Sequence, residues 1–340
     1  MSNNRFFLFA PAAFLWLLSA CHSSPAPTDP IDPNEPEKGS VQVDSIPNPI
    51  SCAHQIGVNQ PLRVGRWYRF LDSLVLAYDT LLPYPLKTEH ILHANPWLLD
   101  TLVNSDYDIQ MARDSFIGDN RLWIVVRPGQ ELCIPDSNAA AEIDRKLAST
   151  WLDINIPEFK LRIVQGSDTL HTCKIRVGQV RIRHLELAGR EVDLRTHTGE
   201  GKIVRVETDP LFLNPVTGEK FTTTRRDDGK RTEMPLIPWI EPEINGQRYG
   251  QLIHPTTNPV TLGKAYSNGC IGASEADAWR VYYHAPVGTK VKIRYELDVV
   301  QPSGDTLHFK DIYHMKGRKS LPKLPSRAII IRPDTIRKDS

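Results

Sequence analysis

Residues 251–272 read QLIHPTTNPVTLGKAYSNGCIG, and this stretch decides how the whole chain is interpreted. It places Cys270 directly behind a Ser-Asn-Gly turn, sixteen residues after His254. A cysteine attacks carbonyl groups only as its thiolate, and a histidine within hydrogen-bond reach helps to form that thiolate. The stretch therefore allows a cysteine nucleophile with a histidine base. A buried turn thiol, a disulfide partner and a metal ligand are the alternatives.

The turn before Cys270 has the residues that an oxyanion hole needs. Gly269 permits a positive φ angle, so the backbone N–H groups from Asn268 to Cys270 can point inward. Ser267 and Asn268 supply short polar side chains that can hold the turn. On these residues alone, catalysis and a buried thiol both remain open.

The surrounding region, 150–297, has the pattern of a mainly β domain. Short runs of alternating apolar and polar residues between glycine-rich turns are typical of strands. One helix is predicted over 275–284, with Ser274 as its N-cap and Asp277 at its third position. The stretch 209–249 is rich in Pro, Gly, Thr and charged residues and predicts a long loop. The expected strands cover residues 161–165, 169–177, 202–207 and 287–293.

The N-terminus predicts export. A basic residue precedes an apolar run of thirteen residues, Phe6–Leu18, and small residues follow it. This is the pattern of a signal peptide over residues 1–20, and the run is shorter than the ~20 residues that span a bilayer. Residues 22–50 contain seven prolines and little to bury. We therefore expect 21–51 to be an extended tether.

A second folded region, 52–137, is predicted to be a small α+β domain. Apolar residues recur at helical spacing over 68–78 and again over 88–98, where Pro96 would end the helix. Residues 122–126 are expected to form a strand. An exported chain permits disulfides, and the two cysteines that bracket this region, Cys52 and Cys133, are the expected pair.

The composition excludes some classes of partner and site. The 340 residues carry a net charge near +1, which gives no basic surplus for nucleic acid. No Cys/His spacing resembles a zinc site, and neither a metal nor a cofactor is expected. Glu89, His90 and His93 could share a helix face, but surface positions on a helix explain them better. Residues 298–340 form a short basic extension whose role the sequence does not indicate.

Several motifs together resemble the L,D-transpeptidase (YkuD-type) catalytic domain. The series begins with Thr-His-Thr-Gly at 196–199 and continues with Ile-His-Pro at 253–255. Ser-Asn-Gly-Cys-Ile at 267–271, Ser-Glu-Ala-Asp-Ala at 274–278 and Pro-Val-Gly-Thr-Lys-Val at 286–291 follow in the order of that family. The resemblance implies a mainly β, β-sandwich-like fold with one short helix after the cysteine.

The resemblance also implies a reaction. Cys270 would attack the carbonyl between the diamino acid and the terminal D-alanine of a peptidoglycan stem peptide, with His254 as its base. A backbone carbonyl near Pro255 would orient the histidine, and the Asn268–Cys270 amides would stabilise the oxyanion. D-Alanine would leave, and an amine from a neighbouring stem, or water, would resolve the thioester.

Three residues depart from the family pattern. Asn268 stands where a histidine is usual, Gly272 where an arginine or asparagine is usual, and Pro255 where a glycine follows the histidine. Losing the charged group at 272 removes a charge-assisted hydrogen bond worth roughly 1.5–3 kcal/mol. The nucleophile and its base are retained while their surroundings differ. This predicts either an altered substrate preference or a lost activity.

Residues 52–137 resemble a LysM module, a small domain that binds the glycan chains of peptidoglycan. The similarity rests on Ala-Asn-Pro-Trp at 94–97 and on the closing Pro-Gly-Gln-Glu-Leu-Cys-Ile-Pro at 128–135. An insertion separates Leu98 from Arg121. The resemblance implies peptidoglycan glycan as a second partner beside the stem peptide.

The end of the signal peptide, Leu18-Ser-Ala-Cys21, resembles a bacterial lipobox. This implies that Cys21 becomes lipidated and anchors the mature chain in a membrane. His22 follows in place of the aspartate that often signals retention at an inner membrane. We therefore expect an exported lipoprotein on the periplasmic face of the outer membrane.

These patterns lead to three hypotheses of function. The leading one is a membrane-anchored L,D-transpeptidase whose LysM-like region holds glycan near the active site, which raises the effective concentration of substrate. An L,D-carboxypeptidase would form the same acyl-enzyme and resolve it with water. A non-catalytic peptidoglycan-binding lipoprotein would keep the fold with a degenerate catalytic site.

Overall fold

The computed structural model describes residues 50–301 and 303–315. The expected signal peptide, Cys21 with its expected lipid and the expected tether up to residue 49 lie outside the described residues, as does the C-terminal extension from residue 316. Within the described ranges, no helix is both long enough and apolar enough to cross a membrane.

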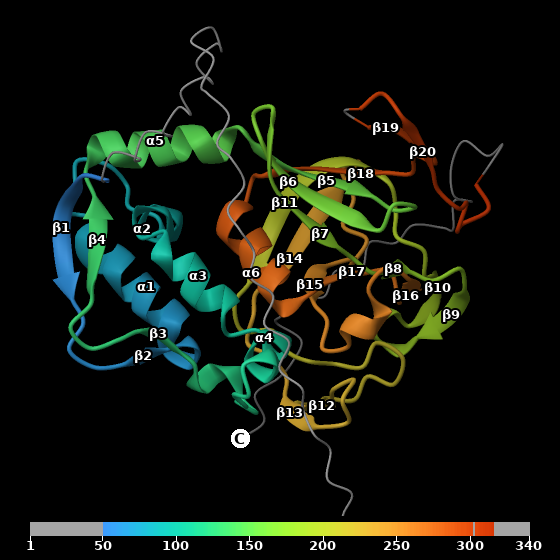
Figure 1. Ribbon diagram of the computed structural model, residues 1–340, viewed down its shortest axis with the longest axis horizontal. Helices are drawn as coiled ribbons and strands as arrows, with labels where there is room; N and C mark the ends of the chain where they lie inside the picture. The colour runs from blue at the N-terminus through green and yellow to red at the C-terminus, as the bar shows by residue number, and fades with distance from the viewer. Residues whose placement is uncertain (1–49, 302, 316–340) are drawn as a thin grey trace, which may run out of the picture. The chain divides into compact units, whose positions relative to one another are not determined.

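The first region begins and ends with strands that pair with each other (Figure 1). Strand β1 (Cys52–Gly57) runs antiparallel to β4 (Glu131–Pro135), and β2 (Leu62–Arg63) runs antiparallel to β3 (Ile124–Val126). The predicted α+β character of this region is therefore present in the structure. The elements between the strands are the helices α1 (Val64–Tyr78), α2 (Thr88–Ala94), α3 (Trp97–Val103) and α4 (Tyr107–Ala112) and the short 3-10 helix η1 (Asn120–Leu122).

Helix α1 follows the predicted spacing, since its buried residues Val64, Trp67, Leu71 and Leu74 recur every three or four positions. The predicted break at Pro96 is also present: α2 ends at Ala94, and Pro96 is the N-cap of α3. Proline has no N–H group to donate into the preceding turn, so the chain starts a new helix there.

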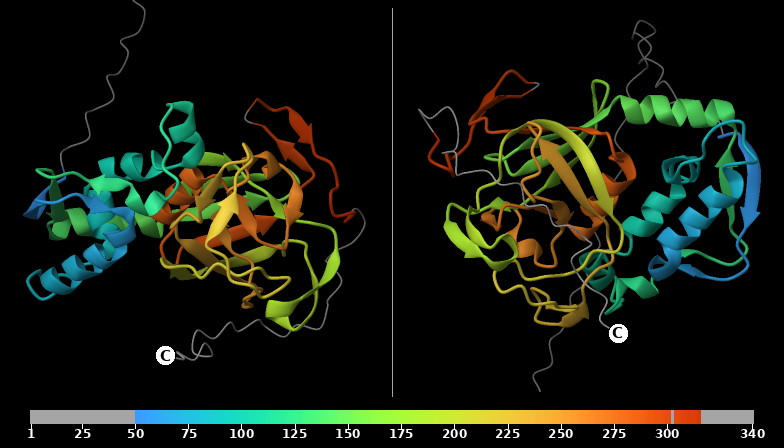
Figure 2. Two further views of the ribbon diagram at one scale, coloured as in Figure 1. Left: turned by 90° about the horizontal axis from the view of Figure 1, so that it is seen from below. Right: turned by 180° about the vertical axis from the view of Figure 1, so that it is seen from behind.

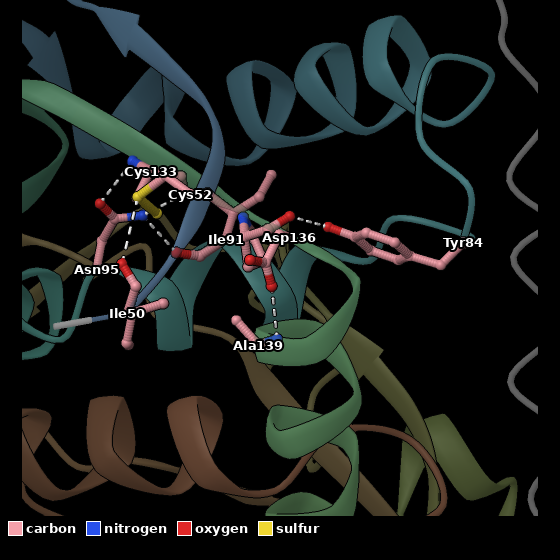
Figure 3. The surroundings of a disulfide bond; sticks show 9 residues. Ile50, Cys52, Tyr84, Ile91, Asn95, Cys133, Asp136 and Ala139 are labelled. Atoms are coloured by element: carbon pink, nitrogen blue, oxygen red, sulfur yellow. Dashed lines mark hydrogen bonds between the residues drawn. A yellow bond between two sulfur atoms is a disulfide. The ribbon is translucent and has the colours of Figure 1, made fainter. Parts of the chain in front are cut away.

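A disulfide joins Cys52 to Cys133, the pair expected from the sequence, and so closes the first region (Figure 3). The side chain of Asn95 is buried beside it and pairs with the backbone of Cys133 in both directions. Its Nδ2 donates to the Cys133 carbonyl at 2.9 Å, and its Oδ1 accepts from the Cys133 N–H at 2.9 Å. Asn95 therefore extends the hydrogen bonding of β4 to the end of α2, which explains the asparagine of the Ala-Asn-Pro motif.

Helix α5 (Ser137–Ala148) connects this region to the next one, and Asp136 caps it by accepting the N–H of Ala139 at 2.9 Å. An eight-stranded sheet follows, with the order β17-β15-β14-β11-β18-β5-β6-β7. The prediction of a mainly β region is confirmed. The strands of this sheet are β5 (Thr150–Asn155), β6 (Lys160–Gln165), β7 (Asp168–Lys174), β11 (Gly199–Glu207), β14 (Trp239–Ile244), β15 (Ile253–Pro255), β17 (Ile271–Ala273) and β18 (Lys290–Arg294).

Most neighbours in the sheet are antiparallel, while β5 runs parallel to β18 and β15 runs parallel to β17. Smaller two-stranded pairs lie outside this sheet. These are β8 (Val177–Gly178) with β16 (Ala265–Ser267), β9 (Ile182–Leu185) with β10 (Arg190–Asp193), β12 (Thr223–Arg225) with β13 (Arg231–Glu233), and β19 (Asp298–Val300) with β20 (Thr306–His308).

The expectation of one long loop over 209–249 is wrong in part. The β12–β13 hairpin lies within it, and its end forms β14, an interior strand of the large sheet. This strand contains Pro242, a residue that cannot donate to a ladder and is unusual in a central strand. In the structure Pro242 lies opposite Ile203, where the register of β11 shifts. The irregular ladder at this point accommodates the residue that has no N–H.

Helix α6 (Glu275–His284) is the predicted helix, and Ser274 caps it by accepting the N–H of Asp277 at 3.0 Å. It packs against the first region as well as against the sheet, as two further views show (Figure 2). Fully buried Trp279 donates its indole N–H to Ser105 Oγ at 3.0 Å, just after α3. One hydrophobic core runs from the first region through α6 into the sheet.

Candidate active site

The two residues singled out from the sequence lie at one edge of the large sheet. His254 is in β15 and Cys270 immediately precedes β17, and these two strands pair in parallel. The register places His254 opposite Gly272. The N–H of Ile271 donates to the carbonyl of Leu252 at 2.8 Å, which holds the two strand starts together. A separation of sixteen residues in the sequence is thus closed by strand pairing.

The imidazole of His254 has a defined tautomer. Its Nδ1 lies 2.8 Å from the carbonyl oxygen of Pro255, and because a carbonyl can only accept, Nδ1 carries the proton. Nε2 is then the atom with a free lone pair. Burial lowers the pKa of His254 to about 4, and the positive charge of Arg176 acts in the same direction. The ring is therefore neutral at pH 7 and able to accept a proton through Nε2.

Cys270 is partly exposed and is not part of a disulfide. Burial raises the pKa of its thiol, while the N–H of Leu252, 3.5 Å from Sγ, and the charge of Arg176 oppose that rise. Within the described residues its thiol bonds to this amide and not to His254. The resting side chain is therefore a thiol, which needs a base when it attacks.

The turn before Cys270 is held from within by Ser267. The hydroxyl of Ser267 donates to the carbonyl of Cys270, and it accepts the N–H of Gly269 at 3.2 Å. Gly269 has a φ of +110°, a conformation that favours glycine. Among the described residues, the N–H groups of Asn268 and Cys270 have no hydrogen-bond acceptor, so these two amides are available to an oxyanion. Asn268 Oδ1 accepts from Gln179 Nε2 at 3.4 Å.

A hydrogen-bond network formed by Thr196 and Tyr313 supports this turn, and it was not predicted from the sequence. Thr196 Oγ1 donates to the carbonyl of Gly269 at 2.9 Å and accepts the N–H of Gly178 at 2.9 Å. The hydroxyl of Tyr313 donates to the carbonyl of Gly178 at 2.7 Å and accepts the N–H of Thr196 at 3.1 Å. Tyr313 is 2% exposed and belongs to the extension that had no assigned role. No local pattern marks it, since the contact joins residues 117 positions apart.

Two aromatic rings from residues 209–249, the stretch predicted to be a loop, lie near His254. The ring of Trp239 lies 5.3 Å from the imidazole of His254, and Phe212 packs edge-on against Trp239 at 5.5 Å. No local sequence pattern marks Trp239 or Phe212 as part of a site. They contribute to the low polarity around His254 that keeps its imidazole neutral.

The described residues contain no group of three or more His, Cys, Asp or Glu side chains that could hold a metal ion. The histidines of α2 point to different partners: His90 Nε2 lies 3.1 Å from an oxygen of Asp144, and His93 Nε2 lies 2.9 Å from the carbonyl of Tyr283. Both contact neighbouring elements, so they connect α2 to α5 and α6.

A strand-held cysteine with a neutral histidine and two free amides is the arrangement of a thiol-dependent acyl-transfer site. Comparison with known proteins agrees with this class. Residues 149–293 match the model of the YkuD L,D-transpeptidase catalytic domain, which confirms that domain in this chain. The match supports an acyltransferase of the transpeptidase type.

A curated relative is similar over a longer stretch. The "Probable L,D-transpeptidase ErfK/SrfK" of Salmonella typhimurium is 23% identical over 245 residues, which cover 68% of this chain and 74% of the relative.

Two solved structures are also similar. The L,D-transpeptidase from Mycobacterium tuberculosis H37Rv has 14% identity and a TM-score of 0.29, over 43% of this chain and 57% of that one. The L,D-transpeptidase from Xylanimonas cellulosilytica has 14% identity and a TM-score of 0.32, over 71% of this chain and 98% of that one.

Proposed function

We propose that this chain is an L,D-transpeptidase that acts on peptidoglycan stem peptides through a thioester on Cys270. The observation that supports the proposal is the pairing of β15 with β17, because His254 lies in β15 and Cys270 immediately precedes β17. The Nδ1–H of His254 donates to the Pro255 carbonyl. The site lies within residues 149–293, the part that matches the YkuD domain.

In the first half-reaction, Nε2 of His254 takes the thiol proton while Sγ of Cys270 attacks the carbonyl between the diamino acid and the terminal D-alanine. The amides of Asn268 and Cys270 stabilise the negative oxygen of the tetrahedral intermediate. Each such donor contributes roughly 2.7–4 kcal/mol in other enzymes. The intermediate breaks its C–N bond, the amine of D-alanine receives the proton from His254, and a thioester remains.

In the second half-reaction, an amine from a neighbouring stem peptide attacks the thioester carbonyl and gives a proton to His254. The C–S bond breaks, a new amide forms, and Cys270 regains its proton. Water in place of the amine would make the same site an L,D-carboxypeptidase.

The first region is proposed to bind peptidoglycan glycan as a LysM-like module. Support comes from its outer strands β1 and β4, which pair around helices, and from Asn95, which ties the Ala-Asn-Pro motif to β4. The proposed lipid on Cys21 would anchor the chain in a membrane, with the periplasmic face of the outer membrane as the proposed location. Anchor and glycan contact would both hold the site near its polymeric substrate.

The first test uses a carbapenem as a probe of Cys270. The purified chain is incubated with the carbapenem, and its intact mass is compared with that of Cys270→Ala and Cys173→Ala. Cys173 is the matched control because it is the other free cysteine of the described chain and is buried. We expect one adduct on the native chain and on Cys173→Ala, and none on Cys270→Ala.

A second assay separates the proposed reactions with a disaccharide tetrapeptide as substrate. Cross-linked dimers together with free D-alanine would support transpeptidation, and free D-alanine with tripeptide alone would support hydrolysis. No adduct and no D-alanine, with the Cys270 thiol shown to be free and reduced, would contradict catalysis and favour the peptidoglycan-binding lipoprotein.

A further inference from the structure

Arg176 is held beside the site by the backbone of Gly272. The backbone N–H of Arg176 donates to the Gly272 carbonyl at 2.8 Å, and the backbone N–H of Gly272 donates to the Arg176 carbonyl at 3.0 Å. The two residues form an isolated antiparallel bridge. Gly272 lies opposite His254 in the parallel pair and two residues after Cys270. The bridge therefore fixes the start of the Arg176 side chain next to both proposed catalytic residues.

The side chain of Arg176 occupies the space that a side chain at 272 would need. A Cβ atom on Gly272 would lie 2.5 Å from Nε of Arg176 and 2.8 Å from its Cγ. A Cβ atom does not approach non-bonded atoms this closely, so a larger residue at 272 would displace the side chain of Arg176. The family pattern has an arginine at 272. Such a side chain and Arg176 in its observed position could not both be present.

The guanidinium of Arg176 lacks an acidic partner among the described residues. Its Nη1 donates to Thr261 Oγ1 at 3.3 Å, a neutral group, and its Nε is buried with no hydrogen-bond partner. A buried cation without an anion is costly, so a neighbouring group that can become an anion gains stability from it. The ionisable groups that its charge acts on are Cys270, His254 and the phenol of exposed Tyr266.

Its positive charge lowers the pKa of the Cys270 thiol and also that of His254. These effects have opposite consequences for a thiolate-imidazolium pair, because one favours the thiolate and the other disfavours the imidazolium. The charge of Arg176 therefore helps to keep the base neutral, and it favours the thiolate of Cys270 against the burial that raises the pKa of the thiol. An arginine keeps its charge at every pH at which the enzyme could work, so this effect does not titrate away.

We propose that Arg176 is the counter-ion of the Cys270 thiolate, and that Gly272 is glycine because it makes room for this guanidinium. The proposal rests on Cys270 being the nucleophile, as proposed above. When Sγ loses its proton to Nε2 of His254, the negative charge that remains lies beside a permanent cation. The missing side chain at 272 is then no loss of function, because the positive charge enters from the segment between β7 and β8.

The test measures the ionisation of Cys270 itself and does not depend on any peptidoglycan reaction. The full chain is alkylated with iodoacetamide between pH 5 and 10, and the labelled fraction is followed by mass spectrometry. Cleavage after Lys264 and Arg280 releases residues 265–280, a peptide that contains Cys270 and no other cysteine. The midpoint of the rate against pH gives the pKa of this thiol.

The variants separate the charge of Arg176 from its packing. Arg176→Met keeps the length of the side chain and removes the charge, and an opposite charge within about 4–6 Å typically shifts a pKa by one to three units. We expect the midpoint to rise by at least one unit, a tenfold loss of thiolate at neutral pH. Arg176→Lys should restore most of the shift. Exposed Arg181 supplies the control, and Arg181→Met should leave the midpoint unchanged.

A midpoint in Arg176→Met equal to that of the native chain, with an unchanged near-UV circular dichroism spectrum, would overturn the proposal. If Arg176→Met loses its tertiary structure, Arg176→Gln is measured in its place. The same rise of one unit in the alkylation midpoint is then expected, and an unchanged midpoint would overturn the proposal. The two proposals fail separately. A shifted midpoint without a carbapenem adduct would support the counter-ion and contradict the transpeptidase, whereas an adduct with no shift would do the reverse.

Discussion

The hydroxyl group of Tyr313 offers the sharpest test of how the turn before Cys270 is supported. Tyr313→Phe removes one oxygen atom and keeps the ring that stacks on Tyr295 at 5.4 Å. The buried N–H of Thr196 and the carbonyl of Gly178 both lose their partner. Each unsatisfied buried group costs about 1–3 kcal/mol, so we expect the free energy of unfolding to fall by about 3 kcal/mol. Urea unfolding monitored by tryptophan fluorescence measures this loss.

The same change should slow acylation of Cys270. Thr196 bonds the carbonyl of Gly269, so a shift of Thr196 moves the turn that presents the oxyanion amides. If the shift reduces transition-state stabilisation by about 1.4 kcal/mol, acylation becomes tenfold slower. The rate of carbapenem adduct formation, followed by intact mass, reports it. Tyr84→Phe is the control, because its hydroxyl bonds the carbonyl of Pro135 and contacts neither Tyr313 nor the turn.

A double-mutant cycle with Thr196→Val decides whether the two hydroxyl groups act as one network. Thr196→Val removes the contacts to Gly178 and Gly269, and its effect should overlap with that of Tyr313→Phe. We expect the loss of unfolding free energy in the double variant to be smaller than the sum of the two single losses by at least 0.5 kcal/mol. Strictly additive losses, or a Tyr313→Phe chain with native stability and native acylation rate, would refute the network.

Three further predictions concern the support of the fold. Arg226→Met leaves the buried carboxylate of Glu275 without its cation. We expect the free energy of unfolding, measured in urea, to fall by about 3–5 kcal/mol. The double variant Arg226→Met with Glu275→Leu should recover most of this loss. Replacing both Cys52 and Cys133 by serine should cost about 2–4 kcal/mol, because their disulfide closes a loop with a sequence separation of 81 residues. Burial lowers the pKa of His284 to about 4. The stability that it contributes is therefore full above its usual pKa of 6.5 and is lost as the pH falls through 4. We expect His284→Leu to remove up to about 3 kcal/mol of the acid dependence of unfolding.

The sequence predicted the parts of the site that local pattern encodes. His254, Cys270 and the capped helix behind them follow from residue types at short spacing, and the structure places them as the strand register requires. The interior strand β14 was missed because residues 209–249 have the composition of a loop, and the register shift that accommodates Pro242 cannot be recognised from composition. Tyr313 and Arg176 were missed because their contacts join segments that share no local motif.

One signal for Arg176 was present and was misinterpreted. Gly272 was taken as the loss of a charged side chain, although a glycine inside a strand often marks the close approach of another group. Its neighbours Ile271 and Ala273 are fully buried, so the absent side chain at 272 leaves space that another group can fill. The departure from the family pattern was interpreted as an altered substrate preference or a lost activity, and a compensating neighbour was not predicted.

The contacts of α6 also bear on how far the two folded regions are independent. The N–H of Ala276 donates to the carboxylate of Asp106 at 2.8 Å, and Trp279 donates to Ser105. Glu275 pairs with Arg226 and accepts the N–H of Tyr107 at 3.3 Å. The first turn of the helix that follows Cys270 is therefore capped by the first region and by the hairpin segment. Removing residues 52–137 would leave these buried groups of α6 without partners, so the first region is part of what positions the segment that contains Cys270.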